Sequence, residues 1–188
     1  MSGSIVSHLR LVSSVPRGPS ADDACLGAFQ GEVEYVFRTL RRLGTAPSEV
    51  EDLAQEVFLA LRGAWSEYDP ERPLRPYLFG IAFRIASAHH RKRKREVSFG
   101  VVELGDAGPG PDDALQSKQA RAVVLAALEV IPLPRRAVLV MHDIDDVPMA
   151  QVAAVLKIPR FTAYSRLRKA RRELDAAVRT ILKEADAR

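Results

Sequence analysis

The sequence contains very little cysteine and few aromatic residues. Cys25 is the only cysteine among 188 residues, and aromatic side chains make up 6%. A single thiol excludes an internal disulfide and offers no cysteine cluster for a metal. The composition therefore suits a reducing cytosol, and we expect Cys25 to be a small core residue. No apolar run approaches the ~18 residues that span a bilayer, so we expect no membrane insertion.

The sequence also lacks the residue patterns of common active sites. Its four histidines are scattered, and two of them, His89 and His90, are embedded in basic sequence. There is no His-x-x-x-His pair, no nucleophile elbow and no glycine-rich phosphate loop. We therefore predict that the protein is not an enzyme and that it uses no metal or cofactor.

Acidic residues are missing from residues 77–95, YLFGIAFRIASAHHRKRKR. At about 100° per residue, Leu78, Ile81 and Ile85 fall on one stripe, which predicts an amphipathic helix packed on a core. An aromatic ring and three guanidinium groups form a neighbouring stripe: Tyr77, Arg84, Arg91 and Arg95. Such a row suits unstacked bases and a phosphate backbone. The alternative is a solvated charge run at the end of a helix.

Basic residues are missing from residues 97–117, which are rich in glycine and proline and carry four acids. The formal charge is +2 over residues 1–96, −4 over 97–117 and +6 over 118–188. We interpret the middle segment as a flexible linker between two small units, 22–96 and 118–182, with a disordered leader (1–21) and a short tail (183–188). Two basic units predict a polyanionic partner.

The first unit is expected to contain two helices before the basic one. In residues 22–43 the apolar side chains recur at helical spacing and predict one buried face: Leu26, Phe29, Val33, Val36, Phe37 and Leu40. Gly44 is a plausible helix end, and Ser48 to Glu51 match a capping box for the next helix. That helix has an apolar side formed by Val50, Leu53, Val57, Leu61 and Ala64.

Polar residues of the second helix surround one apolar side chain. Asp52, Gln55 and Glu56 lie opposite the apolar side, and Leu59 lies among them. An exposed leucine ringed by acid and amide groups is typical of a partner-binding face. A scattered surface leucine is equally common.

Residues 65–76 contain three prolines and form a loop that leads into the basic helix. Tyr68, Arg72 and Arg75 in this loop could hold a splayed base by stacking. Alternatively, the loop aromatics simply cap the small core.

The second unit is predicted to form a series of short helices. We expect helices over residues 118–131 and 135–144, a short helix capped by Asp145 and Asp146, a turn at 157–159 and a basic helix from residue 160. Two short helices joined by a tight turn describe a helix-turn-helix. Side chains suited to base edges and phosphates open the last helix: Arg160, Thr162, Tyr164, Ser165, Arg166 and Lys169. The alternative is a basic amphipathic helix within a bundle.

Three segments carry a family resemblance: EDLAQEVFLAL, YLFGIA with HHRKRKRE, and VPMAQVAAVLKIPRFTAYSRLRKARREL. Their order and spacing resemble a bacterial RNA polymerase sigma factor of the extracytoplasmic function group, in the two-domain form. The sequence departs from the family where Tyr77 replaces the usual tryptophan. It departs again where Phe161-Thr162-Ala163 replaces Gly-Thr-Val, so promoter preference does not carry over from relatives.

The resemblance implies an all-α fold with two helical domains. It implies that Asp52, Gln55, Glu56 and Leu59 bind core RNA polymerase, that the loop and basic helix open the minus-ten element of promoter DNA, and that the helix-turn-helix reads the minus-thirty-five element. It also implies an anti-sigma protein as partner. The alternative function is a stand-alone helix-turn-helix regulator that acts without polymerase.

Overall fold

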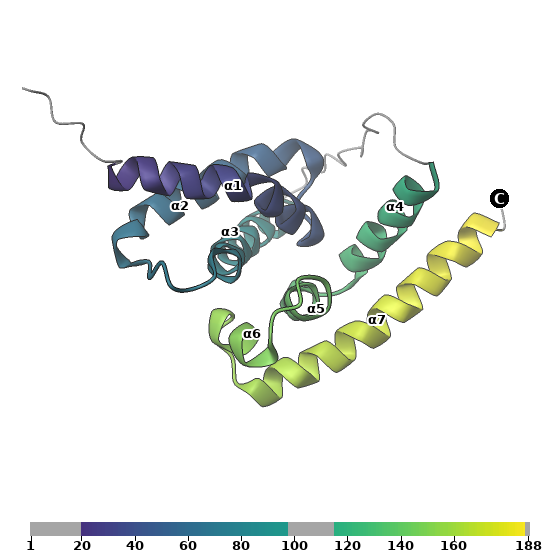
Figure 1. Ribbon diagram of the computed structural model, residues 1–188. Helices are drawn as coiled ribbons and strands as arrows, with labels where there is room; N and C mark the ends of the chain where they lie inside the picture. The colour runs from purple at the N-terminus through teal and green to yellow at the C-terminus, as the bar shows by residue number, and fades with distance from the viewer. Residues whose placement is uncertain (1–19, 98–114, 187–188) are drawn as a thin grey trace, which may run out of the picture.

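The structure, a computed structural model, describes residues 20–97 and 115–186, and within them every regular element is helical. The all-α prediction is therefore confirmed. The first segment contains α1 (Ala21–Arg42), η1 (Pro47–Glu49), α2 (Val50–Gly63), η2 (Trp65–Glu67) and α3 (Leu74–Val97). The second contains α4 (Leu115–Val130), α5 (Leu133–Leu139), the π-helical turn η3 (Val140–Ile144), α6 (Met149–Val155) and α7 (Arg160–Asp186), as Figure 1 shows. The predicted leader and most of the predicted linker lie outside the described residues.

The helix α1 begins and ends where local chemistry favours it. The Ser20 side chain accepts a hydrogen bond from the Asp23 backbone, and the Asp23 carboxylate accepts one from the Ser20 backbone, which forms a capping box. Gly44 follows the helix with a positive φ of 92°, a conformation that favours glycine. The predicted helix end at Gly44 is therefore confirmed.

For two residues of α1 the prediction of a core position is wrong. Leu26 and Val33 are 42% and 37% exposed, whereas Tyr35 and Thr39 are buried. The cause is that α1 carries two neighbouring apolar stripes, and the prediction merged them. Cys25 lies on the inner stripe and is buried, as expected.

The predicted capping box at Ser48 is also wrong. Residues Pro47–Glu49 form a 3-10 turn, and α2 begins at Val50 after Glu49, whose side chain makes no capping bond. The predicted apolar side of α2 is confirmed for Val50, Leu53, Val57 and Leu61, which are buried; Ala64 is half-buried.

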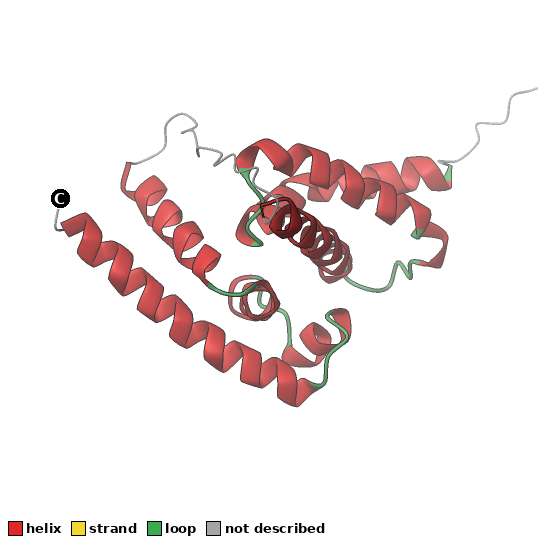
Figure 2. Cartoon of the chain, turned by 180° about the vertical axis from the view of Figure 1, so that it is seen from behind, coloured by secondary structure: helices red, strands yellow, loops and turns green. Residues whose placement is uncertain are grey.

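In the second unit, α6 and α7 form the predicted helix-turn-helix, with the turn over residues 156–159. The inner stripe of α7 is buried at Ala163, Leu167 and Ala170. The predicted cap by Asp145 and Asp146 is wrong, because Pro148 occupies the N-cap position. Helices α4 and α7 run side by side in both views (Figures 1 and 2).

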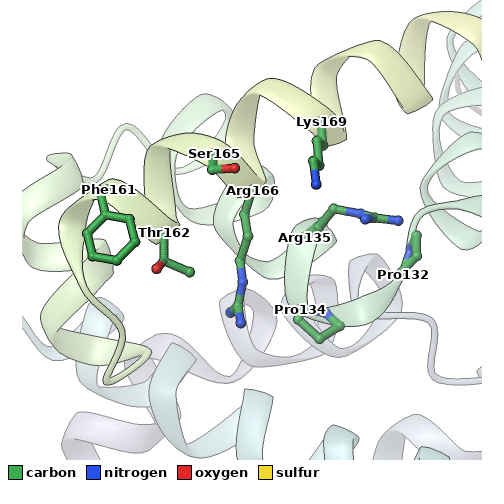
Figure 3. A pocket seen from close by; sticks show the side chains of 8 residues that line it. All are labelled: Pro132, Pro134, Arg135, Phe161, Thr162, Ser165, Arg166 and Lys169. Atoms are coloured by element: carbon green, nitrogen blue, oxygen red, sulfur yellow. The ribbon is translucent and has the colours of Figure 1, made fainter.

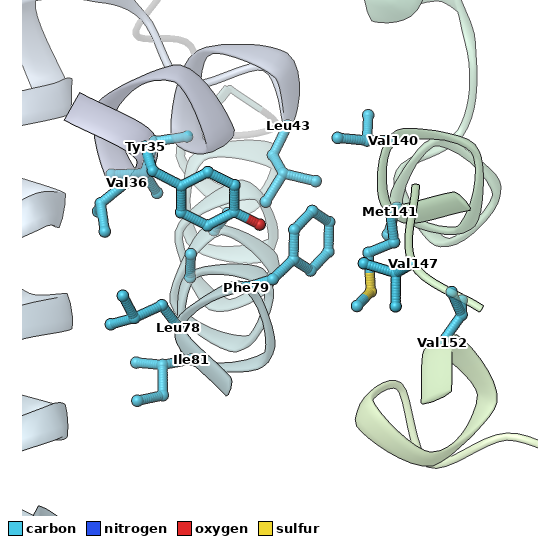
Figure 4. Packing of buried hydrophobic residues seen from close by; sticks show 14 of the residues in the cluster. Tyr35, Val36, Leu43, Leu78, Phe79, Ile81, Val140, Met141, Val147 and Val152 are labelled. Carbon is cyan, nitrogen blue, oxygen red and sulfur yellow. The ribbon is translucent and has the colours of Figure 1, made fainter. Parts of the chain in front are cut away.

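The two units share one continuous core, where the sequence predicted two separate ones. Phe79 of α3 is fully buried, and Figure 4 shows its ring projecting toward Met141 and Val147 of the second unit. Leu43, at the end of α1, belongs to the same cluster. Burying these side chains together removes apolar area from water, and across the same boundary α6 packs on α3 and α4 packs on α1.

Candidate polymerase and nucleic-acid interfaces

One face of α2 carries the residues predicted to contact polymerase. Because the opposite side of this helix is buried in the core, Asp52, Gln55 and Glu56 all point to solvent. Leu59 is 62% exposed among them. An exposed leucine held on a packed helix provides an apolar anchor surrounded by acid and amide groups.

An apolar groove lies beside this face, and the sequence interpretation missed it. It runs between α1 and α2, and Gln55 belongs both to the groove and to the predicted face. Leu26, Val33 and Phe58 line its walls. The signal was present in the sequence, because Leu26 and Val33 are seven residues apart and so lie on one side of α1.

The loop before α3 presents a stack of aromatic rings. The rings of Trp65 and Tyr68 are stacked with centroids 5.2 Å apart, and those of Tyr68 and Tyr77 are tilted with centroids 5.1 Å apart. The Tyr68 hydroxyl donates a hydrogen bond to the Arg72 carbonyl, which fixes the loop. All three rings remain at least partly exposed, so a base can reach them.

The predicted arginines of this region differ in their surroundings. Arg84, Arg91 and Arg95 are exposed along α3. Arg75 instead donates a hydrogen bond to the Glu32 carboxylate at 2.9 Å, and its guanidinium lies 5.3 Å from the centre of the Tyr35 ring. The basic row of α3 is thus open to a phosphate backbone, and Arg75 is bound to α1.

The two histidines of α3 pack at the edge of the basic surface. His90 Nε2 lies 3.1 Å from the Leu43 carbonyl oxygen, and burial lowers the pKa of His90. His89 Nε2 lies 3.3 Å from Glu49, which Arg93 also approaches at 3.6 Å. Both rings therefore connect α3 to the segment between α1 and α2.

The recognition helix α7 begins with two exposed rings. Phe161 is 76% exposed and Tyr164 58% exposed, while Arg160 is exposed before them. Thr162, Ser165, Arg166 and Lys169 line a concave surface that Figure 3 shows. A row of hydroxyl, guanidinium and ammonium groups on one helix face offers donors for base edges and phosphates.

Arg135 belongs to the same concave surface and was not predicted. It extends from α5 toward α7, as Figure 3 shows, and lies 2.9 Å from the Glu173 carboxylate. The Pro134-Arg135 pair at the helix start was the available signal, since a residue in a first turn can reach a backbone phosphate beside the recognition helix.

An ion pair fixes α7 against η3. Arg171 donates two hydrogen bonds to Asp143, at 2.8 and 2.7 Å, and these bonds hold the pKa of the Asp143 carboxyl below its usual value. Arg171 is therefore paired within the protein although its side chain is 57% exposed, and Arg168 and Lys169 are exposed as well.

The described residues contain no group of three His, Cys, Asp or Glu side chains that could hold a metal ion. Nor is any helix in the described ranges long and apolar enough to cross a membrane. The fold and its surfaces define a two-unit, all-helical DNA-binding protein with a helix-turn-helix in its second unit.

Comparison with known proteins specifies the family. Residues 28–96 match the Sigma-70 region 2 family and residues 121–174 match the Sigma-70, region 4 family. The chain is 30% identical over 146 residues to the RNA polymerase sigma factor CnrH of Cupriavidus metallidurans, covering 72% of this chain and 76% of that protein. It is 25% identical over 152 residues to the ECF RNA polymerase sigma factor SigW of Bacillus subtilis, covering 75% of this chain and 81% of that protein.

Two solved structures have the same fold. The sigma factor RpoE from Bartonella quintana, in complex with the anti-sigma factor NepR, matches with a TM-score of 0.64 and 21% identity over 81% of this chain and 97% of that one. CnrH in complex with the cytosolic domain of CnrY matches with a TM-score of 0.58 and 22% identity, over 85% of this chain and 93% of that one. The chain belongs to the extracytoplasmic function group of RNA polymerase sigma factors, which direct core polymerase to promoters for transcription initiation.

Proposed function

We propose that three surfaces divide promoter recognition in this sigma factor, and that its two functional units are residues 22–96 and 118–182. The first surface, Asp52, Gln55, Glu56 and Leu59 on α2, binds core RNA polymerase. Its support is the 62% exposure of Leu59 on a helix whose opposite side is buried. When a partner covers a large apolar side chain that a packed helix holds in water, the burial of apolar surface favours binding.

The second surface opens the minus-ten element. It comprises the loop and α3 through Tyr68, Arg72, Arg75, Tyr77, Arg84, Arg91 and Arg95. Removing a base from the stack costs a few kcal/mol, and stacking it on a ring returns about 1–3 kcal/mol. Because these terms nearly cancel, promoter opening requires polymerase as well, and the chain alone binds promoter DNA weakly.

The third surface reads the minus-thirty-five element in the major groove. It comprises Arg160, Phe161, Thr162, Tyr164, Ser165, Arg166 and Lys169 at the start of α7, with Arg135 added from α5. The concave shape of this surface and its run of donors support the assignment.

An anti-sigma protein is the proposed regulator. The relatives RpoE and CnrH were solved with the anti-sigma factor NepR and the cytosolic domain of CnrY, respectively. A protein that copurifies with this chain and blocks its association with core polymerase would establish the regulator. If the chain still binds core polymerase in the presence of every copurifying protein, that result would argue against an anti-sigma regulator.

The proposed polymerase surface is tested by Leu59→Glu, with binding to core polymerase measured by size-exclusion chromatography. We expect the variant to lose association with core polymerase while its helical content and DNA affinity stay unchanged. Leu182→Glu is the matched control, because Leu182 is a 48% exposed leucine on α7, outside the proposed surface.

The same pair of variants separates the two functions considered. A stand-alone regulator would not depend on Leu59, and it would protect specific DNA sequences without polymerase. Undiminished polymerase binding by Leu59→Glu, or equal loss with Leu182→Glu, would contradict the proposed surface.

A further inference from the structure

A pocket lies between α3 and α6, which are neighbours in Figures 1 and 2. Its volume is about 370 Å³, within the range of about 300–1,000 Å³ that holds small molecules. One wall consists of α3 and the loop before it, and the other consists of α6 and the turn after it. The walls meet at Gly80 and Val155, where a Cβ atom built on Gly80 would lie 3.0 Å from Val155 Cγ1.

Two tyrosine rings form part of the first wall. Tyr68 and Tyr77 both line the pocket, with ring centroids 5.1 Å apart and ring planes tilted by 42°. Both rings are partly buried, and Trp65 stacks on Tyr68 with its centroid 5.2 Å away. Because their neighbours already hold these rings, a flat heterocycle can stack on either of them without ordering it first.

The charged side chains of the pocket all have the same sign. Arg72, Arg84 and Lys157 are exposed and line it, and no acidic residue in the described ranges does. Arg72 lies 3.3 Å from the Asp69 carboxylate, in a pair open to solvent. Within the part of the chain that the structure describes, Arg84 and Lys157 form no ion pair. Cations on both walls attract a ligand with more than one negative charge.

The second wall adds groups that lie outside the three proposed promoter and polymerase surfaces. Gln151 of α6 brings an amide, which both donates and accepts hydrogen bonds. Lys157 brings an ammonium group from the turn between α6 and α7. Because neither residue belongs to those surfaces, the pocket is more than a continuation of the minus-ten surface.

The combination of rings and cations selects a class of ligand. A base inside a DNA strand brings one phosphate charge per nucleotide, whereas a free polyphosphate brings several charges to one end of the molecule. A purine offers a larger face for stacking than a pyrimidine. We propose that the pocket binds a purine nucleoside polyphosphate, whose base stacks on one of the two tyrosine rings and whose phosphates bind the three cations.

A nucleotide in this pocket shares four residues with the proposed minus-ten surface: Tyr68, Arg72, Tyr77 and Arg84. The nucleotide and single-stranded promoter DNA therefore compete for the same rings and guanidinium groups. A rising nucleotide concentration then reduces promoter opening. This consequence rests on the proposed function, whereas the binding of a nucleotide to the free chain does not.

Isothermal titration calorimetry of the full-length chain with ATP and GTP, without divalent metal, tests the pocket. Inorganic triphosphate and guanosine supply the two halves of the ligand separately. We expect one nucleotide per chain and binding of each half at least about tenfold weaker, because stacking and charge both contribute. The tighter of ATP and GTP identifies the preferred base. No binding of either at about 1 mM, or equally tight binding of triphosphate, would overturn the proposal.

Lys157→Glu tests the location of the site. It should weaken nucleotide binding by at least about tenfold, since reversing the charge turns attraction for phosphate into repulsion. Lys183→Glu is the matched control, because it makes the same change at an exposed position of α7 outside the pocket. Circular dichroism should show the same helical content for both variants. Equal nucleotide affinities of the two variants would contradict the assigned site.

A competition assay connects the pocket with the proposed function. The tighter-binding nucleotide is titrated into the free chain bound to a fluorescent single-stranded DNA of random sequence. We expect the DNA to be displaced, and displacement from Lys157→Glu to need about tenfold more nucleotide. Nucleotide binding without displacement would refute the competition. If the chain binds the nucleotide but not core polymerase, the proposed function is wrong and the pocket assignment stands.

Discussion

Phe161 stands at the first turn of α7 with 76% of its surface exposed. Most of this apolar ring contributes nothing to the core, so selection for folding does not explain it. In the proposed docking of α7 the ring faces the DNA major groove, where a thymine methyl is the apolar feature of a base edge. The residue is therefore expected to influence which promoters are chosen.

Phe161→Ala should change promoter preference without changing stability. The free energy of unfolding should shift by less than about 0.5 kcal/mol, because the ring is exposed. Sequencing of genomic fragments retained by the polymerase complex should show a different base preference in the minus-thirty-five element. Leu182→Ala, at the other end of α7, serves as the control, and identical preferences for native and Phe161→Ala complexes would contradict the role.

Single residues were predictable where the helix pattern alone decides their surroundings. Leu59 was expected to be exposed because it lies opposite the apolar side of its own helix, and it is. Arg75 was not predictable, because its partner Glu32 lies 43 residues away on another helix. Its proposed contact with DNA therefore requires it to leave Glu32.

At the scale of elements, the end of α1 determines how the first unit meets the second. Gly44 has φ of 92°, and a Cβ at this position would collide with the Arg136 guanidinium. The turn thus needs glycine for two reasons, one conformational and one steric.

Gly44→Ala should lower the free energy of unfolding by about 1–3 kcal/mol, since it combines a left-handed alanine with a displaced buried arginine. Chemical denaturation followed by circular dichroism measures the change. Gly31→Ala is the control within α1, because its Cβ would meet nothing within 4 Å. It should stabilise the helix by up to about 1 kcal/mol, and a similar effect of both substitutions would contradict this account of Gly44.

The helices themselves were largely predictable, and their faces less so. The stripe of Ala163, Leu167 and Ala170 in α7 is continuous, so the buried side of this helix was predicted correctly. In α1 two apolar stripes compete, and only the packing of α2 and α3 decides that Tyr35 is buried and Val33 is not. Periodicity locates an amphipathic helix but does not choose between neighbouring faces.

At the scale of the whole molecule, the packing of the two units on each other was not predicted. The sequence indicated a linker and two charged units, which suggests separation. The hydrogen bond between Tyr35 and Asp145 joins residues 110 positions apart, and no local sequence pattern predicts it. Asp145 was instead interpreted as a helix cap, because acids before a short helix usually serve that purpose.

Burial raises the pKa of Asp145, against the lowering effect of the Tyr35 and Arg42 hydrogen bonds. The carboxyl leaves water for a site where the Tyr35 hydroxyl and Arg42 only partly replace its hydration. An interface held by such a residue depends on both partners being in place. The packing of the two units at Asp145 therefore depends on the hydrogen bonds from Tyr35 and Arg42.

The central claim is that this chain is the promoter-recognition subunit of a polymerase, and in vitro transcription tests it most directly. Purified chain and core RNA polymerase are mixed with genomic fragments from its own source, and the 5′ ends of the transcripts are mapped. The account predicts discrete start sites that appear only when chain and core polymerase are both present. Transcripts that do not depend on the chain, or sequence-specific protection of DNA by the chain without polymerase, would contradict it.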